Sequence, residues 1–166
     1  MASERDWANG YYQQALADMN AARVLQGQEP SVLAMLLQML LEKLAKAALL
    51  RSGLIPVARA TQSHAAASAL VQQLWRNRRA CERLGFKPEV VRFNLAPIVE
   101  QLERSHPQFA QGGPSLEYPW ETPSGEVQWP AAHLEVARKF RPRSLQGQML
   151  FEFASRLCDR FEQVFP

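Results

Sequence analysis

The sequence of 166 residues contains only two cysteines, Cys81 and Cys158, and no recognisable pattern of metal-binding residues. Neither cysteine has the spacing of a zinc site, and two thiols do not form a disulfide framework. We therefore interpret both as reduced thiols buried on helices, and we predict a cytoplasmic protein with no metal and no other cofactor. The first residues, MASERDWANGYY, lack an apolar core, so we expect no signal peptide.

Motifs of several large enzyme classes are also missing. The sequence has no glycine loop of the kind that surrounds phosphates and no nucleophile elbow, and no segment of it resembles a convincing strand. The formal net charge of +3 is mild, whereas a dedicated binder of duplex DNA is usually more basic. This charge permits an anionic partner without requiring one.

One stretch, residues 31–50, is apolar at almost every position: SVLAMLLQMLLEKLAKAALL. Its main exceptions, Gln38, Glu42 and Lys46, fall four residues apart and therefore lie on one line along a helix, with Lys43 to the side. A helix that is apolar on nearly all sides is buried, so this segment is predicted to be the central helix of the fold. Its apolar run ends before the roughly 20 residues that a bilayer requires, and we expect no membrane partner.

Helical spacing of apolar residues predicts several further helices around this central one. We expect long helices over residues 4–26, 61–84 and 144–165, and short helical pieces near 88–94, 96–104 and 130–139. The short link between the first two helices predicts an antiparallel hairpin. The predicted class is all-α: an antiparallel four- to five-helix bundle with a long irregular crossover before the last helix. We expect a single domain over residues 1–166, with a helical core over 3–104 and 144–165 and a long loop over 105–143, rich in proline and glycine.

Arg59 and His64 form the first candidate site, because they lie five residues apart in RATQSH. A cation can hold an RNA phosphate while an imidazole with a suitable pKa moves the proton of the 2′-hydroxyl. The alternative, which is commoner, is a surface histidine near a helix N-terminus. His106 and His133 have no ligand pattern near them, and zinc binding would require a convergence that the sequence does not show.

The line of Gln38, Glu42 and Lys46 is the second candidate, in which Lys46 contributes to a nucleotide or phosphate site at a groove. The alternatives are a helix face open to solvent, or an ion pair between Glu42 and Lys46 at the favoured spacing of four residues.

Three arginines, Arg76, Arg79 and Arg83, form the third candidate, because they share one face of the helix predicted over residues 61–84. Guanidinium groups in such a row can hold phosphates by forked hydrogen bonds, and the neighbouring Trp75 can stack on a base. The alternative is a charged face in contact with water only.

Aromatic residues in the long loop form the fourth candidate. Tyr118, Trp120 and Trp129 are interspersed with glutamates and prolines in SLEYPWETPSGEVQWP, which suits a lid or a partner-binding surface. The alternative is that these aromatic side chains cover the core.

Three segments together resemble the HEPN-domain family: YYQQALADMNAARVL, then the central SVLAMLLQMLLEKLAKAALL, and then SHAAASALVQQL. The central segment matches the family helix in which an apolar run leads into Glu-Lys and a further lysine. The segment EYPW is similar to the Tyr-Pro segment ahead of the family's last helix. The resemblance implies an antiparallel helical bundle that is often a homodimer. Many members are metal-independent endoribonucleases of bacterial defence or toxin–antitoxin systems, with an arginine followed after four to six residues by a histidine.

Arg59 and His64 match the family spacing, but they open the third predicted helix, whereas the family's catalytic pair belongs to the late helix. Near that late helix Arg141 and Arg143 have no histidine after them, and Ala60 stands where the family usually has a polar residue. The resemblance therefore favours a non-catalytic HEPN-like module that binds a nucleotide, RNA or a partner protein. The alternatives are a metal-independent endoribonuclease that uses Arg59 and His64, and a purely structural interaction protein.

Overall fold

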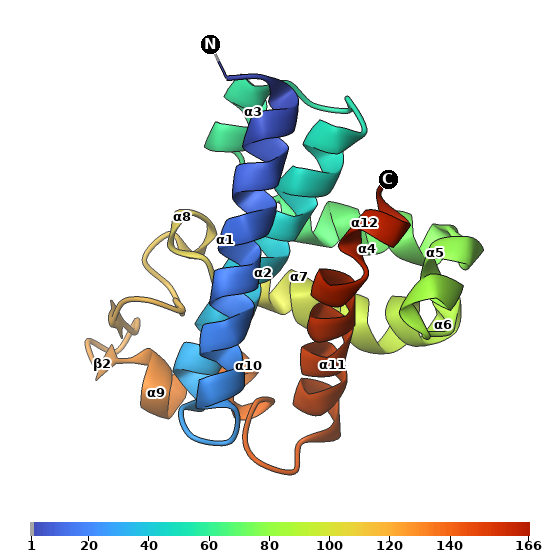
Figure 1. Cartoon of the computed structure of the whole chain (residues 1–166). Helices are drawn as coiled ribbons and strands as arrows, with labels where there is room; N and C mark the ends of the chain where they lie inside the picture. The colour runs from blue at the N-terminus through green and yellow to red at the C-terminus, as the bar shows by residue number, and fades with distance from the viewer. Residues whose placement is uncertain (1) are drawn as a thin grey trace.

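Two long helices, α1 (Glu4–Leu25) and α2 (Pro30–Arg51), form the antiparallel hairpin on which the other elements pack (Figure 1). The computed structural model describes residues 2–166. Ser3 and Asp6 begin α1 with a capping box, in which each residue's side chain accepts a hydrogen bond from the other's backbone amide. The hairpin predicted from the sequence is confirmed.

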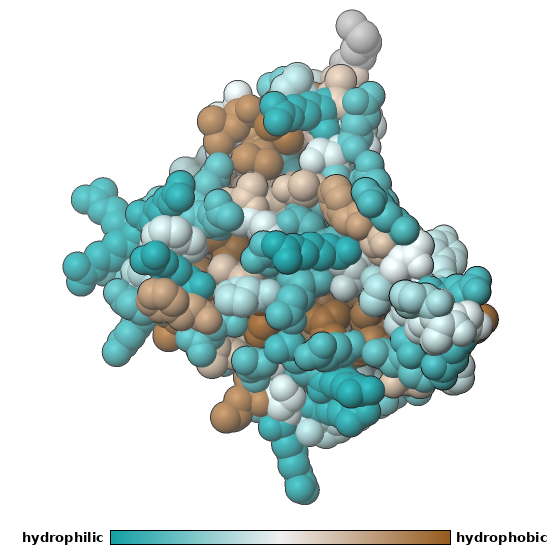
Figure 2. All heavy atoms as spheres, turned by 180° about the vertical axis from the view of Figure 1, so that it is seen from behind, coloured by the Kyte–Doolittle hydropathy of each residue, from teal (hydrophilic) through white to brown (hydrophobic). Residues whose placement is uncertain are grey.

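Helix α2 is enclosed by its neighbours, as its apolar sequence predicts. Its side chains Leu37, Leu40 and Leu44 have no exposed surface, and α2 contacts seven other helices. On the face of the molecule opposite to that of Figure 1, hydrophilic side chains cover most of the surface and hydrophobic ones gather in patches between them (Figure 2). Within residues 2–166, no helix combines the length and the apolar character needed to cross a membrane.

The remaining elements are mostly short helices. In chain order they are α3 (Val57–Gln62), α4 (Ala66–Arg76), α5 (Arg78–Leu84), α6 (Pro88–Val90), the π-helix η1 (Val91–Leu95), α7 (Ala96–Arg104), α8 (Pro107–Ala110), β1 (Trp120–Glu121), β2 (Val127–Gln128), α9 (Pro130–His133), α10 (Glu135–Arg138), α11 (Leu145–Asp159) and α12 (Phe161–Val164). Of these elements, α3, α4, α7, α9, α10 and α11 contact α2, as α1 does. The all-α class is confirmed, and one small antiparallel hairpin of two-residue strands, which we did not predict, is added to it.

The single helix predicted over residues 61–84 is wrong, because the chain forms three helices there. Helix α3 begins at Val57, before the start of the predicted helix, and Ser63 ends it in an extended conformation. Asn77 interrupts the helix a second time, and its side chain caps α5 by accepting a hydrogen bond from the Ala80 amide at 3.1 Å. Asparagine favours such a boundary because its side chain satisfies a free amide at a helix start.

The break predicted near Asn94 is also wrong. The chain stays helical from α6 through η1 into α7, where the Ala96 amide donates to the carbonyl of Val91, five residues back. Pro97 follows at the start of α7, where an amide donor is not required. The wider π turn thus accommodates the proline without ending the helix.

The long connection over residues 105–143 is partly ordered into helices and covers one side of the core. Leu116, Trp120, Leu134 and Phe140 from this connection are buried in the same hydrophobic cluster as the centre of α2. The last predicted helix is divided at Arg160, where α11 ends and the short α12 begins.

Both cysteines are free and buried on helices, Cys81 on α5 and Cys158 on α11. Burial raises the pKa of the Cys158 thiol to about 12, and it also raises the pKa of Cys81. Because the thiolate is the reactive form, we expect neither residue of the native protein to react with Ellman's reagent at mildly alkaline pH. The absorbance of released thionitrobenzoate measures this, and the urea-unfolded chain, which should react at both thiols, is the control. Rapid labelling of the native chain would contradict the prediction.

Candidate functional site

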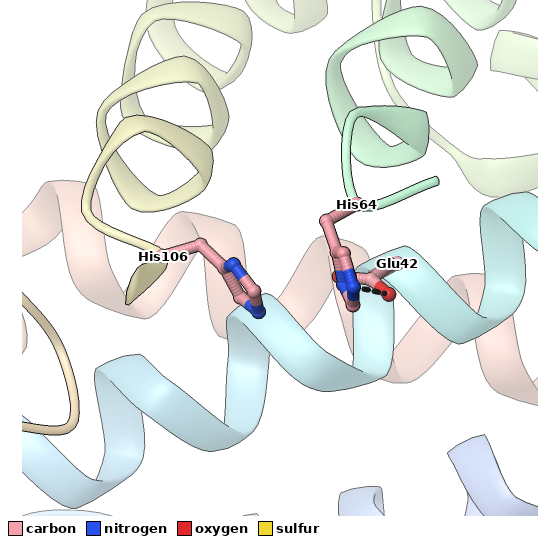
Figure 3. A group of neighbouring side chains, drawn as sticks. All are labelled: Glu42, His64 and His106. Atoms are coloured by element: carbon pink, nitrogen blue, oxygen red, sulfur yellow. Dashed lines mark hydrogen bonds and ion pairs between the residues drawn. The ribbon is translucent and has the colours of Figure 1, made fainter. Parts of the chain in front are cut away.

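Three side chains from distant parts of the sequence meet beside the middle of α2: Glu42, His64 and His106. Glu42 belongs to α2, His64 to the segment between α3 and α4, and His106 is the residue that caps α8. Both imidazoles point toward α2 (Figure 3), and one ligand atom from each of the three residues lies within 4.8 Å of the other two. We call these three residues the Glu–His–His cluster.

Glu42 is the most highly bonded member of the cluster. Its Oε1 accepts from Lys46 Nζ at 2.7 Å and lies 3.1 Å from His64 Nδ1, while its Oε2 accepts from Gln38 Nε2 at 3.1 Å. The side chains of Glu42 and Lys46 are only 10% and 6% exposed. The polar line of α2 is therefore not a solvent-exposed face, and the ion pair at spacing four, which the sequence offered as an alternative, is present.

The protonation state of Glu42 determines how His64 is bonded. Burial raises the pKa of this carboxyl, but hydrogen bonds and charge from Lys46, with smaller contributions from Gln38 and His64, outweigh burial and leave the pKa below its ordinary value. An ionised carboxylate can only accept hydrogen bonds, so Nδ1 of His64 carries the hydrogen that Glu42 binds. Nε2 of His64 is then the ring nitrogen without a hydrogen, and it is the atom available as a base.

His106 stacks on His64, with 4.4 Å between the ring centroids and 19° between the ring planes. Its Nδ1 accepts a long hydrogen bond of 3.3 Å from the Gln108 amide. Burial lowers the pKa of His106, and the charge of His64 lowers it further. Two stacked imidazoles disfavour a second positive charge, so His106 is neutral at neutral pH.

A pocket of about 340 Å³ lies close to the cluster, between α2, α3 and α4, and its wall includes both Lys46 and Arg59. Ser63 and Gln73 add polar groups, while the apolar part of the wall includes Leu49, Leu54 and Ile55. Arg59 is exposed, and no acidic side chain within residues 2–166 forms an ion pair with it. The structure thus brings two predicted site residues, Lys46 and Arg59, to one pocket.

His64 does not belong to the wall of this pocket, although its neighbours Ser63 and Ala65 do. The predicted pair of Arg59 and His64 is therefore connected indirectly. His64 bonds to Glu42, Glu42 pairs with Lys46, and Lys46 shares the pocket with Arg59.

The continuous arginine row predicted for Arg76, Arg79 and Arg83 is not formed, because the helix is interrupted at Asn77. Arg76 ends α4, whereas Arg79 and Arg83 belong to α5. Arg83 also donates to the carbonyl of Gln163 near the end of the chain. The face of Trp75, expected to stack on a base, is approached by two guanidinium groups, those of Arg76 at 5.1 Å and Arg92 at 4.9 Å.

The aromatic residues of the long connection divide into two kinds. Trp120 is buried and packs in the core, as the alternative interpretation of the loop predicts. Tyr118 and Trp129 are 60% and 48% exposed, and Trp129 contacts the ring of His133 edge-on. A lid or partner surface thus remains a prediction for Tyr118 and Trp129 only.

Sequence reasoning missed His106 as a member of the site. It stands 42 positions after His64 and 64 after Glu42, by their residue numbers, and no local pattern joins the three. The only signal is that His64 and His106 each stand shortly before a helix. That signal does not reveal that the two helix starts lie side by side.

Comparison with known proteins adds no assignment to this geometry: no family model, no curated protein and no solved structure matches the chain. The cluster and the neighbouring pocket are therefore the features from which a function can be inferred.

Proposed function

We propose that the chain binds a phosphorylated ligand, either a nucleotide or a phosphate of RNA, in the pocket between α2, α3 and α4. The observation that carries this proposal is Arg59, an arginine in the pocket wall that forms no ion pair within residues 2–166. Guanidinium groups form forked hydrogen bonds with phosphate oxygens, and Ser63 adds a hydroxyl donor to the same wall.

Lys46 supports the proposal more weakly than Arg59 does. Its ammonium group is already paired with Glu42, which compensates most of its charge. Arg59 therefore supplies most of the uncompensated positive charge of the pocket. The apolar residues Leu49, Leu54 and Ile55 provide a surface on which a base or sugar can pack. This arrangement agrees with the non-catalytic HEPN-like module that the sequence favours.

Replacing Arg59 with alanine should weaken binding of a phosphorylated ligand about 10- to 100-fold, because a hydrogen bond to a charged group contributes about 1.5–3 kcal/mol. Fluorescence polarisation with a labelled adenine nucleotide and a labelled single-stranded RNA measures the affinity. Arg78→Ala is the matched control, because Arg78 is an exposed arginine of α5 that pairs with Glu82. The proposal fails if neither probe binds the wild-type protein, or if Arg59→Ala and Arg78→Ala bind equally well.

Light scattering on the same samples tests the homodimer that the resemblance implies.

A metal-independent ribonuclease is the second candidate, and one observation favours it. His64 Nδ1 donates a hydrogen bond to the buried Glu42, and this bond fixes the orientation of the imidazole. Histidines that act as general bases in active sites are often oriented by a carboxylate in this way. The exclusion of His64 from the wall of the Arg59 pocket favours binding over cleavage. RNA cleavage in excess chelator that disappears in His64→Ala would establish the ribonuclease. An intact RNA that still binds would support the binding module.

A further inference from the structure

The Glu–His–His cluster has the composition of a metal site. Two imidazoles and one carboxylate are a ligand set that Zn²⁺, Co²⁺, Ni²⁺ and Fe²⁺ use in proteins. The three donors come from three separate elements, which α2 and the helix starts of α4 and α8 hold together (Figure 3). We propose that Glu42, His64 and His106 bind one divalent transition-metal ion of the zinc class, a site that is independent of phosphate binding in the neighbouring pocket.

The distances within the cluster require only a small contraction on binding. Ligand atoms of the three residues already lie within 4.8 Å of one another. Zinc–ligand bonds of about 2.0–2.1 Å place the donor atoms of a tetrahedral site about 3.3 Å apart. Metal binding therefore shortens the distance between any two donor atoms by at most about 1.5 Å, from no more than 4.8 Å in the structure to about 3.3 Å in the metal site.

Both histidines must adjust when an ion binds. Nδ1 of His64 faces Glu42 and donates to it, so this hydrogen has to move to Nε2 before an ion can lie between the two side chains. His106 needs a larger change of orientation. Its ring is nearly parallel to that of His64, so one of the two rings has to turn before both nitrogens face the same ion. While Nδ1 of His106 accepts from the Gln108 amide, its hydrogen lies on Nε2. Binding an ion through Nε2 moves this hydrogen to Nδ1 and costs the 3.3 Å hydrogen bond, which is long and therefore weak. The side chain of His64 is 34% exposed, which gives the ion a route from solvent.

The groups around Glu42 determine how strongly the ion is held. Gln38 donates to Oε2 of Glu42 and orients the carboxylate, as partners outside the ligand set do in metal sites. Lys46 acts in the opposite direction, because its ammonium lies 2.7 Å from Oε1 and repels a cation at the same oxygen. Three protein ligands leave one coordination position for water or for an oxygen of another ligand.

Titration of the EDTA-treated, dialysed protein tests the site directly. We expect one Zn²⁺ per chain by calorimetry, and with Co²⁺ a visible absorption band typical of tetrahedral coordination. His64→Ala and His106→Ala should each weaken the affinity for Zn²⁺ at least about 10-fold. His133→Ala is the matched control, since His133 is a half-buried histidine of the long connection that contacts Trp129 and not the cluster. Absence of binding at one ion per chain, or equal affinities in His106→Ala and His133→Ala, would overturn the proposal.

A second variant separates the metal site from the phosphate pocket. Lys46→Met removes a positive charge that lies beside both the metal site and the phosphate pocket. It should strengthen Zn²⁺ binding about 10-fold or more, because the ammonium repels the cation. It should weaken phosphate binding, because the pocket loses a positive charge. Circular dichroism at the titration temperature establishes that the variant is folded. Weaker or unchanged Zn²⁺ binding by folded Lys46→Met would contradict the geometry proposed for Glu42. The histidine variants test the site even if Lys46→Met does not fold.

Discussion

Lys46→Met is expected to lower the free energy of unfolding by about 3 kcal/mol. The substitution retains an unbranched apolar stem but removes the ammonium group that lies 2.7 Å from Glu42 Oε1, in a pair whose side chains are 6% and 10% exposed. Removing one partner of a buried pair costs about 3–5 kcal/mol because the other charge remains without water. Gln38 and His64 still bind Glu42, which places the expected loss at the lower end of that range.

Urea unfolding followed by circular dichroism measures the loss, and two further variants identify its cause. Arg78→Met breaks an ion pair of the same i,i+4 spacing between side chains that are 85% and 59% exposed, and it should change stability by less than about 1 kcal/mol. Adding Glu42→Gln to Lys46→Met removes the uncompensated charge and should restore part of the lost stability. If Lys46→Met and Arg78→Met cost the same, the Glu42–Lys46 pair is not buried in solution.

The sequence predicted the hairpin and its buried second helix because periodicity and turn residues are local signals. An almost uninterrupted apolar segment has to be enclosed, and a four-residue turn between two long helices leaves only an antiparallel arrangement. The same pattern could not decide the environment of Gln38, Glu42 and Lys46. A polar line on an apolar helix has the same spacing whether it faces water or the interior. That line is buried by contacts with distant parts of the chain, among them the segment that places His64 against Glu42 and the ring of Tyr11 below Lys46.

Helix interruptions were predicted less well because single residues there have competing preferences. Asn77 is compatible with a helix interior, but it caps α5 instead, and the turn it makes separates Arg76 from Arg79. Pro97 normally ends a helix, yet the π turn that precedes it removes the conflict. Around these two positions the chain packs on distant helices, since α5 and η1 both contact α11, and a local pattern does not contain such contacts.

The candidate site was predicted in part for the same reason. Arg59 and His64 were predicted as a pair from their spacing, and Lys46 was predicted from the polar line of the central helix. The structure adds the connection between these two candidates through Glu42. His106 could not be found, because it reaches the cluster through the turn between α7 and α8 and not through any spacing in the chain. A site assembled from three distant segments becomes visible only when the tertiary contacts are known.

Gly147→Ala is expected to lower the free energy of unfolding by about 3 kcal/mol, at the upper end of what overpacking costs. Gly147 lies in the first turn of α11, where the start of that helix packs directly on the end of the long connection. A β-carbon at this position would collide with the carbonyl oxygen of Lys139 and would lie 3.0 Å from the α-carbon of Phe140. Both are backbone atoms, so the strain cannot be relieved by turning a side chain. Helix α11 and the segment after α10 would have to separate, and Phe140, which is 4% exposed, would lose packing.

Gly10→Ala is the matched control for this prediction, and its effect should have the opposite sign. Gly10 lies inside α1, and a β-carbon there meets no atom within 4 Å. Alanine at an exposed helical position should therefore raise the free energy of unfolding by about 0.5–1 kcal/mol, because it restricts the unfolded chain more than glycine does. Urea unfolding of the two variants against the wild-type protein gives both values. If Gly147→Ala is as stable as Gly10→Ala, then α11 does not contact residues 139–140. The long connection would then not be fixed to the last long helix, and the packing of Phe140 in the core would be wrong.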